Sequence, residues 1–358
     1  MIPHVGRASA RRSRAAILLV ALGSLAACQW ACSAPSESPS TSGVTPGTPS
    51  DPVGQGPPLP SLAAYRESVQ RARSWLDTLH VDPAELRAHG IKGKKKLVEL
   101  LDAYYELWKV APPREREVLM ARIREVVKVT YEPAYHDMLT IRDEWFKQDA
   151  TSYLRAALLM ERLGLDISMY RAEIAKIHDR LDAHMRERGP HQREVFHWYY
   201  RDFGLSEPFP LEEARNEGVI AHRENPAVMS DPQVYELTHE IYAPFEYGDK
   251  RDVNPFDGSE RSYLRNTLDR LLRRYLARKD PDLVAELLEC EHYLMMDDGP
   301  ASREAVTYLL ESQNQDGSWG SYPRQRRLLG DYVKQGFELH TTMVVIGALA
   351  VEYEKRVS

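Results

Sequence analysis

The amino-acid sequence predicts an all-α protein built from helical hairpins and preceded by a disordered tether. From residue 61 to residue 358, apolar side chains recur every three or four residues, which is typical of amphipathic helices. Strand-like alternation of apolar and polar residues is nearly absent. Several of the periodic segments begin after Ser or at Asp-Pro and end at Gly, as capped helices do.

The first 27 residues have the pattern of an export signal. Four arginines precede an apolar run at 15–27, and no acidic residue occurs before Glu37. Such a run is typical of a secretory signal, because a transmembrane helix needs about 20 apolar residues. The run ends in Leu-Ala-Ala-Cys, which resembles the bacterial lipobox and implies a lipid on Cys28. We therefore expect a lipoprotein anchored to a membrane of the bacterial cell envelope through Cys28, and Gln29 after it favours the outer membrane.

Residues 28–60 are rich in Pro, Ser, Gly and Thr and hold few large apolar side chains. Such a segment cannot bury enough apolar surface to offset the entropy of ordering it, so we expect a flexible tether. Cys32 lies in this tether, and Cys290 stands alone in an apolar stretch, which argues against a disulfide scaffold.

Loss of the export signal would leave 43 basic and 53 acidic residues, a formal charge of −10. An acidic balance argues against a nucleic-acid-binding protein. The one basic cluster, at residues 92–96, has no interleaved aromatic side chain. We therefore expect no nucleic-acid partner.

The periodic segments fall into an N-terminal helical region of residues 61–148 and a second region of residues 149–358. The first contains segments 61–79, 95–110 and 114–131. The second contains segments 150–166, 169–189, 191–204, 231–245, 260–280, 281–296, 302–312 and 336–356. Each segment is long enough for at least three turns of an amphipathic helix.

Three of these helices carry a metal-ligand type of residue at a regular interval. His239, Cys290 and His340 are separated by 51 and 50 residues, each within an apolar helical stretch. A period near 50 made of helix pairs indicates stacked or circularised hairpins. In a ring of hairpins, the inner helices would turn these three residues toward one central cavity.

The stretch SQNQDGSWG supplies a resemblance to a known superfamily. Gln313, Gly317 and Trp319 resemble the QW motif of terpenoid cyclases and protein prenyltransferases. In that superfamily the motif clips the end of an outer helix to its neighbour in an (α/α) toroid. The resemblance implies such a toroid for residues 149–358, with Gln313 bonded to the N-terminus of a neighbouring helix. The Asp-Gly pair is itself a turn signal.

A second resemblance concerns the segment FELHTTMVVIGALA. It is similar to a prenyltransferase β-subunit helix whose histidine binds zinc together with an aspartate and a cysteine. His340 matches the histidine and Cys290 the cysteine, whereas Leu288 stands where the aspartate would be. His239, one repeat earlier, could supply the third ligand instead, and a thiolate with two imidazoles would form a three-ligand zinc site with one open position.

Other interpretations stay open beside this one. Cys290 would equally suit a buried core thiol, and lone histidines on apolar faces are usually structural. The helix 191–204 carries His and Tyr residues that could serve a polysaccharide lyase. The loops 206–230 and 246–261 are long and could border a binding site. The function is therefore expected to be a metal-assisted enzyme, a non-catalytic ring that binds a small molecule or partner, or a carbohydrate-active ring with a glycan ligand.

Overall fold

The computed structural model describes residues 58–85 and 93–357, and within them every regular element is a helix. The all-α prediction is therefore confirmed. The predicted export signal, the lipidation site Cys28 and nearly all of the predicted tether lie outside the described residues. Among the helices that are described, none is both long and apolar enough to cross a membrane.

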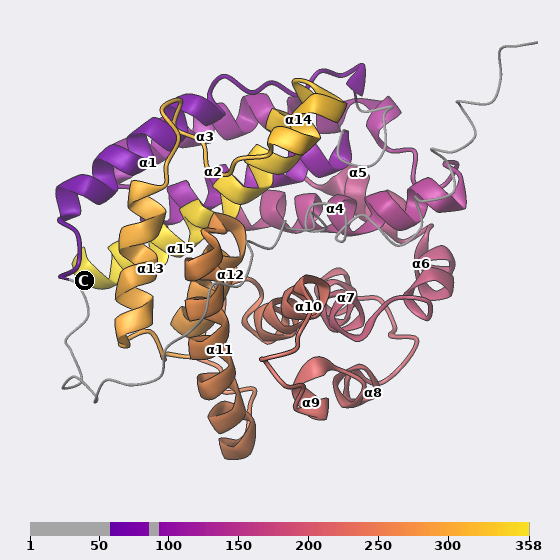
Figure 1. Cartoon of the computed structure of the whole chain (residues 1–358). Helices are drawn as coiled ribbons and strands as arrows, with labels where there is room; N and C mark the ends of the chain where they lie inside the picture. The colour runs from indigo at the N-terminus through magenta and orange to yellow at the C-terminus, as the bar shows by residue number, and fades with distance from the viewer. Residues whose placement is uncertain (1–57, 86–92, 358) are drawn as a thin grey trace, which may run out of the picture.

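The described part of the chain folds into fifteen α-helices, which are labelled in Figure 1. In chain order they are α1 (Leu62–Leu76), α2 (Lys94–Val110), α3 (Pro113–Val127), α4 (Asp143–Arg162), α5 (Ser168–Ile174), α6 (His178–Met185), α7 (Pro190–Phe203), α8 (Leu211–Asn216), α9 (Val219–His222), α10 (Asp231–Tyr242), α11 (Gly258–Arg278), α12 (Pro281–Tyr293), α13 (Pro300–Glu311), α14 (Pro323–Leu329) and α15 (Leu339–Val357). A π-helical turn, Lys334–Glu338, leads directly into α15.

Six of these helices pack in a closed ring. Along the chain, α2 packs on α4, α4 on α7, α7 on α10, α10 on α12 and α12 on α15, and α15 returns to pack on α2. The remaining long helices each pack against a member of this ring: α1 against α15, α3 against α2, and α11 and α13 against α12. In Figure 1 the yellow α15 accordingly runs close to the purple helices from the start of the body. Residues 61–148 and 149–358 thus contribute to one ring.

Helix caps explain where the later ring helices begin. Ser230 and Gln233 form a capping box at the start of α10, and Asp280 accepts a hydrogen bond from the backbone N–H of Leu283 at the start of α12. Both helices have proline in their first turn, where its missing N–H is not needed. The Ser-Asp-Pro and Asp-Pro signals in the sequence therefore start the helices that carry the central side chains.

The QW-like stretch clips three helices together. Gln313 donates from Nε2 to the carbonyl of Ser68 in α1 at 2.9 Å, and buried Trp319 donates from Nε1 to Leu309 in α13 at 2.6 Å. The Trp319 backbone N–H reaches Thr342 in α15 at 3.0 Å. Gln313 therefore bonds the middle of α1 and not a helix N-terminus as expected, because the turn at Gly317 approaches α1 side-on. A Cβ at Gly317 would lie 2.2 Å from the Arg71 carbonyl oxygen.

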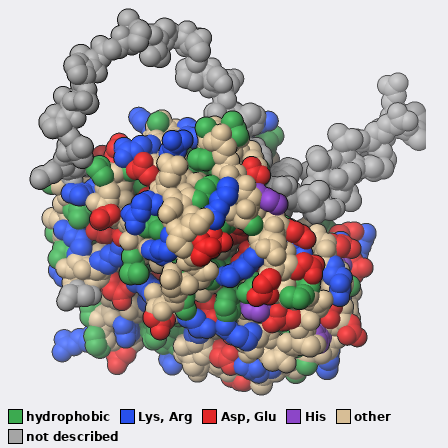
Figure 2. Space-filling model, turned by 90° about the horizontal axis from the view of Figure 1, so that it is seen from below, with side chains coloured by type: hydrophobic (Ala, Val, Ile, Leu, Met, Phe, Trp, Pro, Cys, Tyr) green, Lys and Arg blue, Asp and Glu red, His purple; other side chains and the backbone are tan. Residues whose placement is uncertain are grey.

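Charge is spread over the surface. On the face shown in Figure 2, acidic and basic side chains intermingle, and hydrophobic side chains are scattered among them. Positive charge is not gathered into one stripe on that face, although recognition of a nucleic acid is usually accompanied by such a stripe.

Candidate metal centre

Helix α12 is buried on every side, yet it carries carboxylates. Each residue from Asp282 to Tyr293 is buried, including Glu286 and Glu289. A buried carboxylate is costly unless hydrogen bonds and opposite charge compensate it. The hydrogen bonds and charges around these carboxylates therefore determine whether they can bind a cation.

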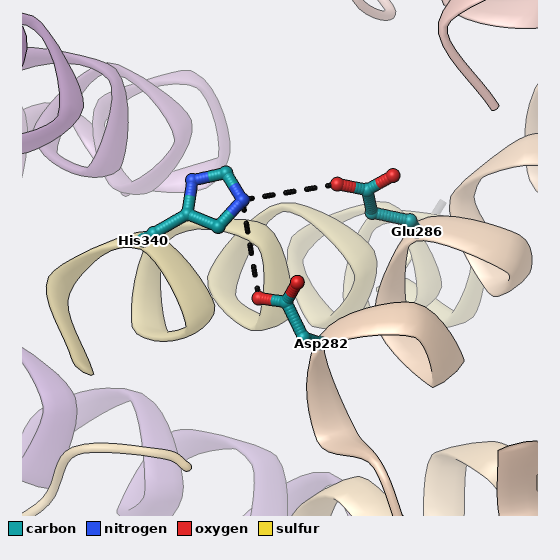
Figure 3. A group of neighbouring side chains, drawn as sticks. All are labelled: Asp282, Glu286 and His340. Atoms are coloured by element: carbon teal, nitrogen blue, oxygen red, sulfur yellow. Dashed lines mark ion pairs between the residues drawn. The ribbon is translucent and has the colours of Figure 1, made fainter. Parts of the chain in front are cut away.

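Two carboxylates and one imidazole converge where α12 meets α15. Asp282 and Glu286 lie one turn apart on the same face of α12, and His340 lies in the first turn of α15 (Figure 3). The Nε2 atom of His340 is 3.9 Å from Asp282 Oδ1 and 3.9 Å from Glu286 Oε1. The three ligand atoms all lie within 4.8 Å of one another, which is the spacing of a metal-binding group.

A second layer of side chains orients these three residues. Glu99 of α2 lies 3.1 Å from Nδ1 of His340, so that Nδ1–H donates to it and Nε2 faces Asp282 and Glu286. A carboxylate behind a histidine is the arrangement that orients histidine ligands in metal sites.

The hydroxyl groups around the two carboxylates complete this layer. Tyr235 donates to Asp282 Oδ2 at 2.6 Å, and Thr341 donates to Asp282 Oδ1 at 2.7 Å. Thr238 donates to Glu286 Oε2 at 2.6 Å. Oε1 of Glu286 consequently points to His340; α10 orients both carboxylates, and α15 also orients that of Asp282.

The electrostatics of the cluster favour a cation between the ligands. Burial opposes protonation of His340, but Asp282 and Glu99 raise its pKa to about 9. Burial and the neighbouring charge of Asp282 raise the pKa of Glu286 to about 8. At neutral pH each of the two groups therefore holds a proton, and a divalent cation could replace these two protons without changing the total charge of the site.

The donor set suits a first-row divalent metal such as zinc, which accepts both imidazole and carboxylate ligands. Zinc bonds of about 2.0–2.2 Å place two ligands of a tetrahedral ion about 3.3–3.5 Å apart. The two 3.9 Å separations at His340 would have to close by about 0.5 Å, which small side-chain rotations can supply.

Of the three ligands predicted from the sequence, His340 alone belongs to this group. Cys290 lies one turn beyond Glu286 on the same face of α12, fully buried, with Sγ 3.8 Å from the Thr238 carbonyl oxygen. Burial raises the pKa of this thiol well above its ordinary value, so it remains protonated. The spacing Asp-x₃-Glu-x₃-Cys, which puts all three on one helix face, was the sequence signal for the two carboxylates.

His239 lies near the group without joining it. Its Nδ1–H donates to the Tyr235 carbonyl at 2.8 Å, and its ring is 5.8 Å from the ring of His191. Burial lowers the pKa of His239 to about 4 and that of His191 to about 3. The two histidines are therefore neutral, and His239 keeps a free acceptor at Nε2.

The His and Tyr residues considered for a lyase have other partners. His197 pairs with Glu207 toward the surface, and Tyr200 donates to Asp182 at 2.6 Å. Much of the predicted loop 206–230 folds into α8 and α9. Glu246, in the other predicted loop, forms ion pairs with Arg162 of α4 and Arg201 of α7. These pairs connect two neighbouring helices of the ring.

A family model described as "Domain of unknown function (DUF6895)" matches residues 65–350. No curated protein and no solved structure matches the chain. The matched residues run from α1 into α15 and include Glu99, Asp282, Glu286 and His340. Because the match spans most of the sequence, the chain belongs to the DUF6895 family.

Proposed function

We propose that this protein is a metal-assisted enzyme that holds a divalent cation, zinc in the first place, on Asp282, Glu286 and His340. The observation that carries the proposal is the convergence of these three ligand atoms within 4.8 Å, with the other polar side-chain atom of each residue hydrogen-bonded to Glu99, Thr238 or Tyr235. Predicted ligands His239 and Cys290 are replaced by the two carboxylates of α12.

The chemistry follows from the number of protein ligands. Three ligands leave a position for water, and zinc lowers the pKa of a bound water to about 7, which favours hydrolysis. Glu99 would keep the His340 ring in place, and Nε2 of neutral His239 would be available to accept a proton. Thr238 and Tyr235 would keep the carboxylates from turning away.

Metal analysis of the untagged full-length protein tests the proposal. We expect about one zinc per chain, lost in His340→Gln and in Glu286→Gln. Glu291→Gln is the matched control, because Glu291 is also buried on α12 but accepts a hydrogen bond from the Ser302 hydroxyl, 2.7 Å away, and lies outside the cluster. A folded protein that takes up no zinc, manganese or iron would falsify the proposal.

The runner-up is a metal-free, carbohydrate-active ring. Glu286, with its pKa raised to about 8, would be the proton donor and Asp282 the second carboxylate of the pair. Hydrolytic activity that survives thorough chelation and disappears in Glu286→Gln would select this candidate over the metal enzyme.

We also propose that the protein is exported and lipid-anchored on Cys28 in the cell envelope. The arginine-rich start, the apolar run and the Leu-Ala-Ala-Cys sequence support this. In a bacterial host, wild-type protein should partition with membranes and carry the mass of a lipid, whereas Cys28→Ser should do neither. Cys32→Ser, four residues away, should behave like the wild type.

A further inference from the structure

The short helix α14 differs from the other α-helices of the described chain, because it buries none of its side chains. Even the four-residue α9 buries Val219 and Ile220. Pro323 begins α14 and Gly330 follows its last residue, so local signals set its two ends. Figure 1 shows the helix at the periphery of the molecule. Packing in an apolar core therefore does not account for α14.

One side of α14 rests on the body of the protein. Gln325 and Leu329, one turn apart, are half-buried on this side. Arg326 forms an ion pair with Glu338 of the π-helical turn, which ties the helix to the start of α15. The opposite side of the helix consequently faces away from the body.

This outward side combines positive charge with an apolar side chain. It consists of Arg324, Arg327 and Leu328, which are neighbours because they lie three and four positions apart on a helix. Leu328 is 75% exposed. Both arginines are exposed, and neither forms an ion pair with another described residue. We call these three residues the α14 patch. A partner with an anionic surface and an apolar layer beneath it would satisfy all three.

The charge of the α14 patch is opposite to that of the protein. Helix α14 contains three arginines and no acidic residue, whereas the chain without its export signal has a formal charge of −10. An anionic membrane repels an acidic protein, so a basic patch determines which side of it approaches. Anionic headgroups attract arginine, and the acyl layer below them takes up leucine. A nucleic acid would supply the negative charge without the apolar layer. The patch is therefore complementary to an anionic lipid surface.

We infer that the α14 patch docks on an anionic phospholipid membrane, with Arg324 and Arg327 at the headgroups and Leu328 inserted between them. The inference rests on the lipid anchor proposed for Cys28, which would hold the patch close to the membrane. Residue 58 lies 30 positions after Cys28. A flexible tether of that length spans roughly 30 Å. Because such tethering gives an effective concentration on the order of millimolar, a patch of weak affinity is sufficient.

Docking is tested on the full-length protein in vesicles of phosphatidylethanolamine and phosphatidylglycerol, with phosphatidylcholine vesicles for comparison. Hydrogen–deuterium exchange of residues 323–330 measures the docked fraction. We expect slower exchange on the anionic vesicles, and a return to the phosphatidylcholine rate at high salt. Arg324→Gln/Arg327→Gln should lower the ratio of docked to free protein by roughly 25-fold, about fivefold for each arginine. Leu328→Ser should lower it by about tenfold or more.

Two matched variants serve as controls. Arg265→Gln/Arg270→Gln removes two exposed arginines from α11, which lies well away from α14 in Figure 1. Val228→Ser changes another apolar side chain that is 75% exposed. Both variants should keep the wild-type exchange of residues 323–330. Thermal unfolding of each variant confirms that it is folded.

The outcomes separate the docking from the anchor. A lipidated protein whose α14 exchanges equally on both kinds of vesicle, or is unaffected by the substitutions in the patch, would overturn the docking and leave the anchor standing. A protein whose mass shows no lipid, but which sediments with anionic vesicles unless both arginines are replaced, would retain the docking and remove the anchor. Exchange that slows with protein concentration and not with vesicles would assign the patch to a second copy of the chain and overturn the inference.

Discussion

Two clusters in this protein each combine one histidine with two carboxylates, but the pKa of a carboxylate is lowered in one cluster and raised in the other. At one, His340 faces Asp282 and Glu286; at the other, His292 faces Asp297 and Glu352. In the second cluster, the ammonium of Lys355 bonds to Asp297 and lies 3.1 Å from Nδ1 of His292. In the first cluster, by contrast, the imidazole of His340 is paired with both carboxylates.

The pKa values follow from this difference. Although burial opposes it, His292 and Lys355 lower the pKa of Asp297 below its ordinary value. Burial and Asp282 instead raise the pKa of Glu286 to about 8. In the second cluster Lys355 already neutralises the carboxylate, so the group acts as a structural ion pair. In the first cluster protons supply the positive charge, and a metal cation could take their place.

The largest effect that tests this contrast is the pH dependence of zinc binding. Zinc must displace the protons of His340 and Glu286, whose pKa values are raised to about 9 and about 8. Affinity should therefore rise by up to about tenfold per pH unit for each proton released, from pH 6 until it levels off near pH 9. Titrations in buffers of different protonation enthalpy would count the protons.

Stability of the metal-free protein should change in the opposite direction. Both pKa values are higher in the folded chain than in the unfolded chain, so the folded state binds more protons. Its stability is fully present below the unfolded values near 4.5 and 6.5 and falls as pH rises toward 8 and 9. If chelated protein were equally stable at pH 6 and pH 9, the proposed proton-holding state would be wrong.

The second prediction concerns the clip that holds α15, and with it His340, in the ring. Gly317 has φ +97° and leaves no room for a Cβ beside Arg71. Gly317→Ala should lower the free energy of unfolding by about 2–4 kcal/mol and weaken zinc binding as well. Gly204→Ala, with φ +68° and open space around it, should cost only about 1 kcal/mol and leave zinc binding unchanged. Chemical denaturation of both variants makes the comparison.

A third change would convert one cluster toward the other. Lys355→Met removes the ammonium from beside His292, Asp297 and Glu352. Since Lys355 is 38% exposed, we expect a loss of only about 1 kcal/mol in unfolding free energy, partly restored by added zinc. Lys279→Met, at the C-terminal cap of α11, serves as the control. A variant that neither loses stability nor responds to zinc would show that lysine is not what distinguishes the clusters.

The smallest effect should come from Cys290. Its protonated thiol packs against α10 and contributes no ligand atom to the centre. Cys290→Ala should therefore cost about 1 kcal/mol, from a small cavity, and retain zinc. Loss of zinc in this variant would restore the thiolate site expected from the sequence.

The helices themselves could be predicted because their signals are local. Apolar spacing, Asp-Pro starts and the turn at Gly317 act over a few residues, and each produced the element expected of it. His340 could also be proposed as a ligand from its own neighbourhood, since it lies in the first turn of a long helix of small apolar residues.

The partners of His340 depend on how helices distant in sequence are placed against one another. Glu99 meets it across 241 residues of sequence, because α15 returns to close the ring on α2. Which turn of α12 lies opposite His340 depends on the relative axial position of α12 and α15. The periodicity of apolar residues contains no information about that position. A shift of one or two turns brings Asp282 and Glu286 instead of Cys290 opposite His340, so the packing of the ring determines which side chains could serve as ligands.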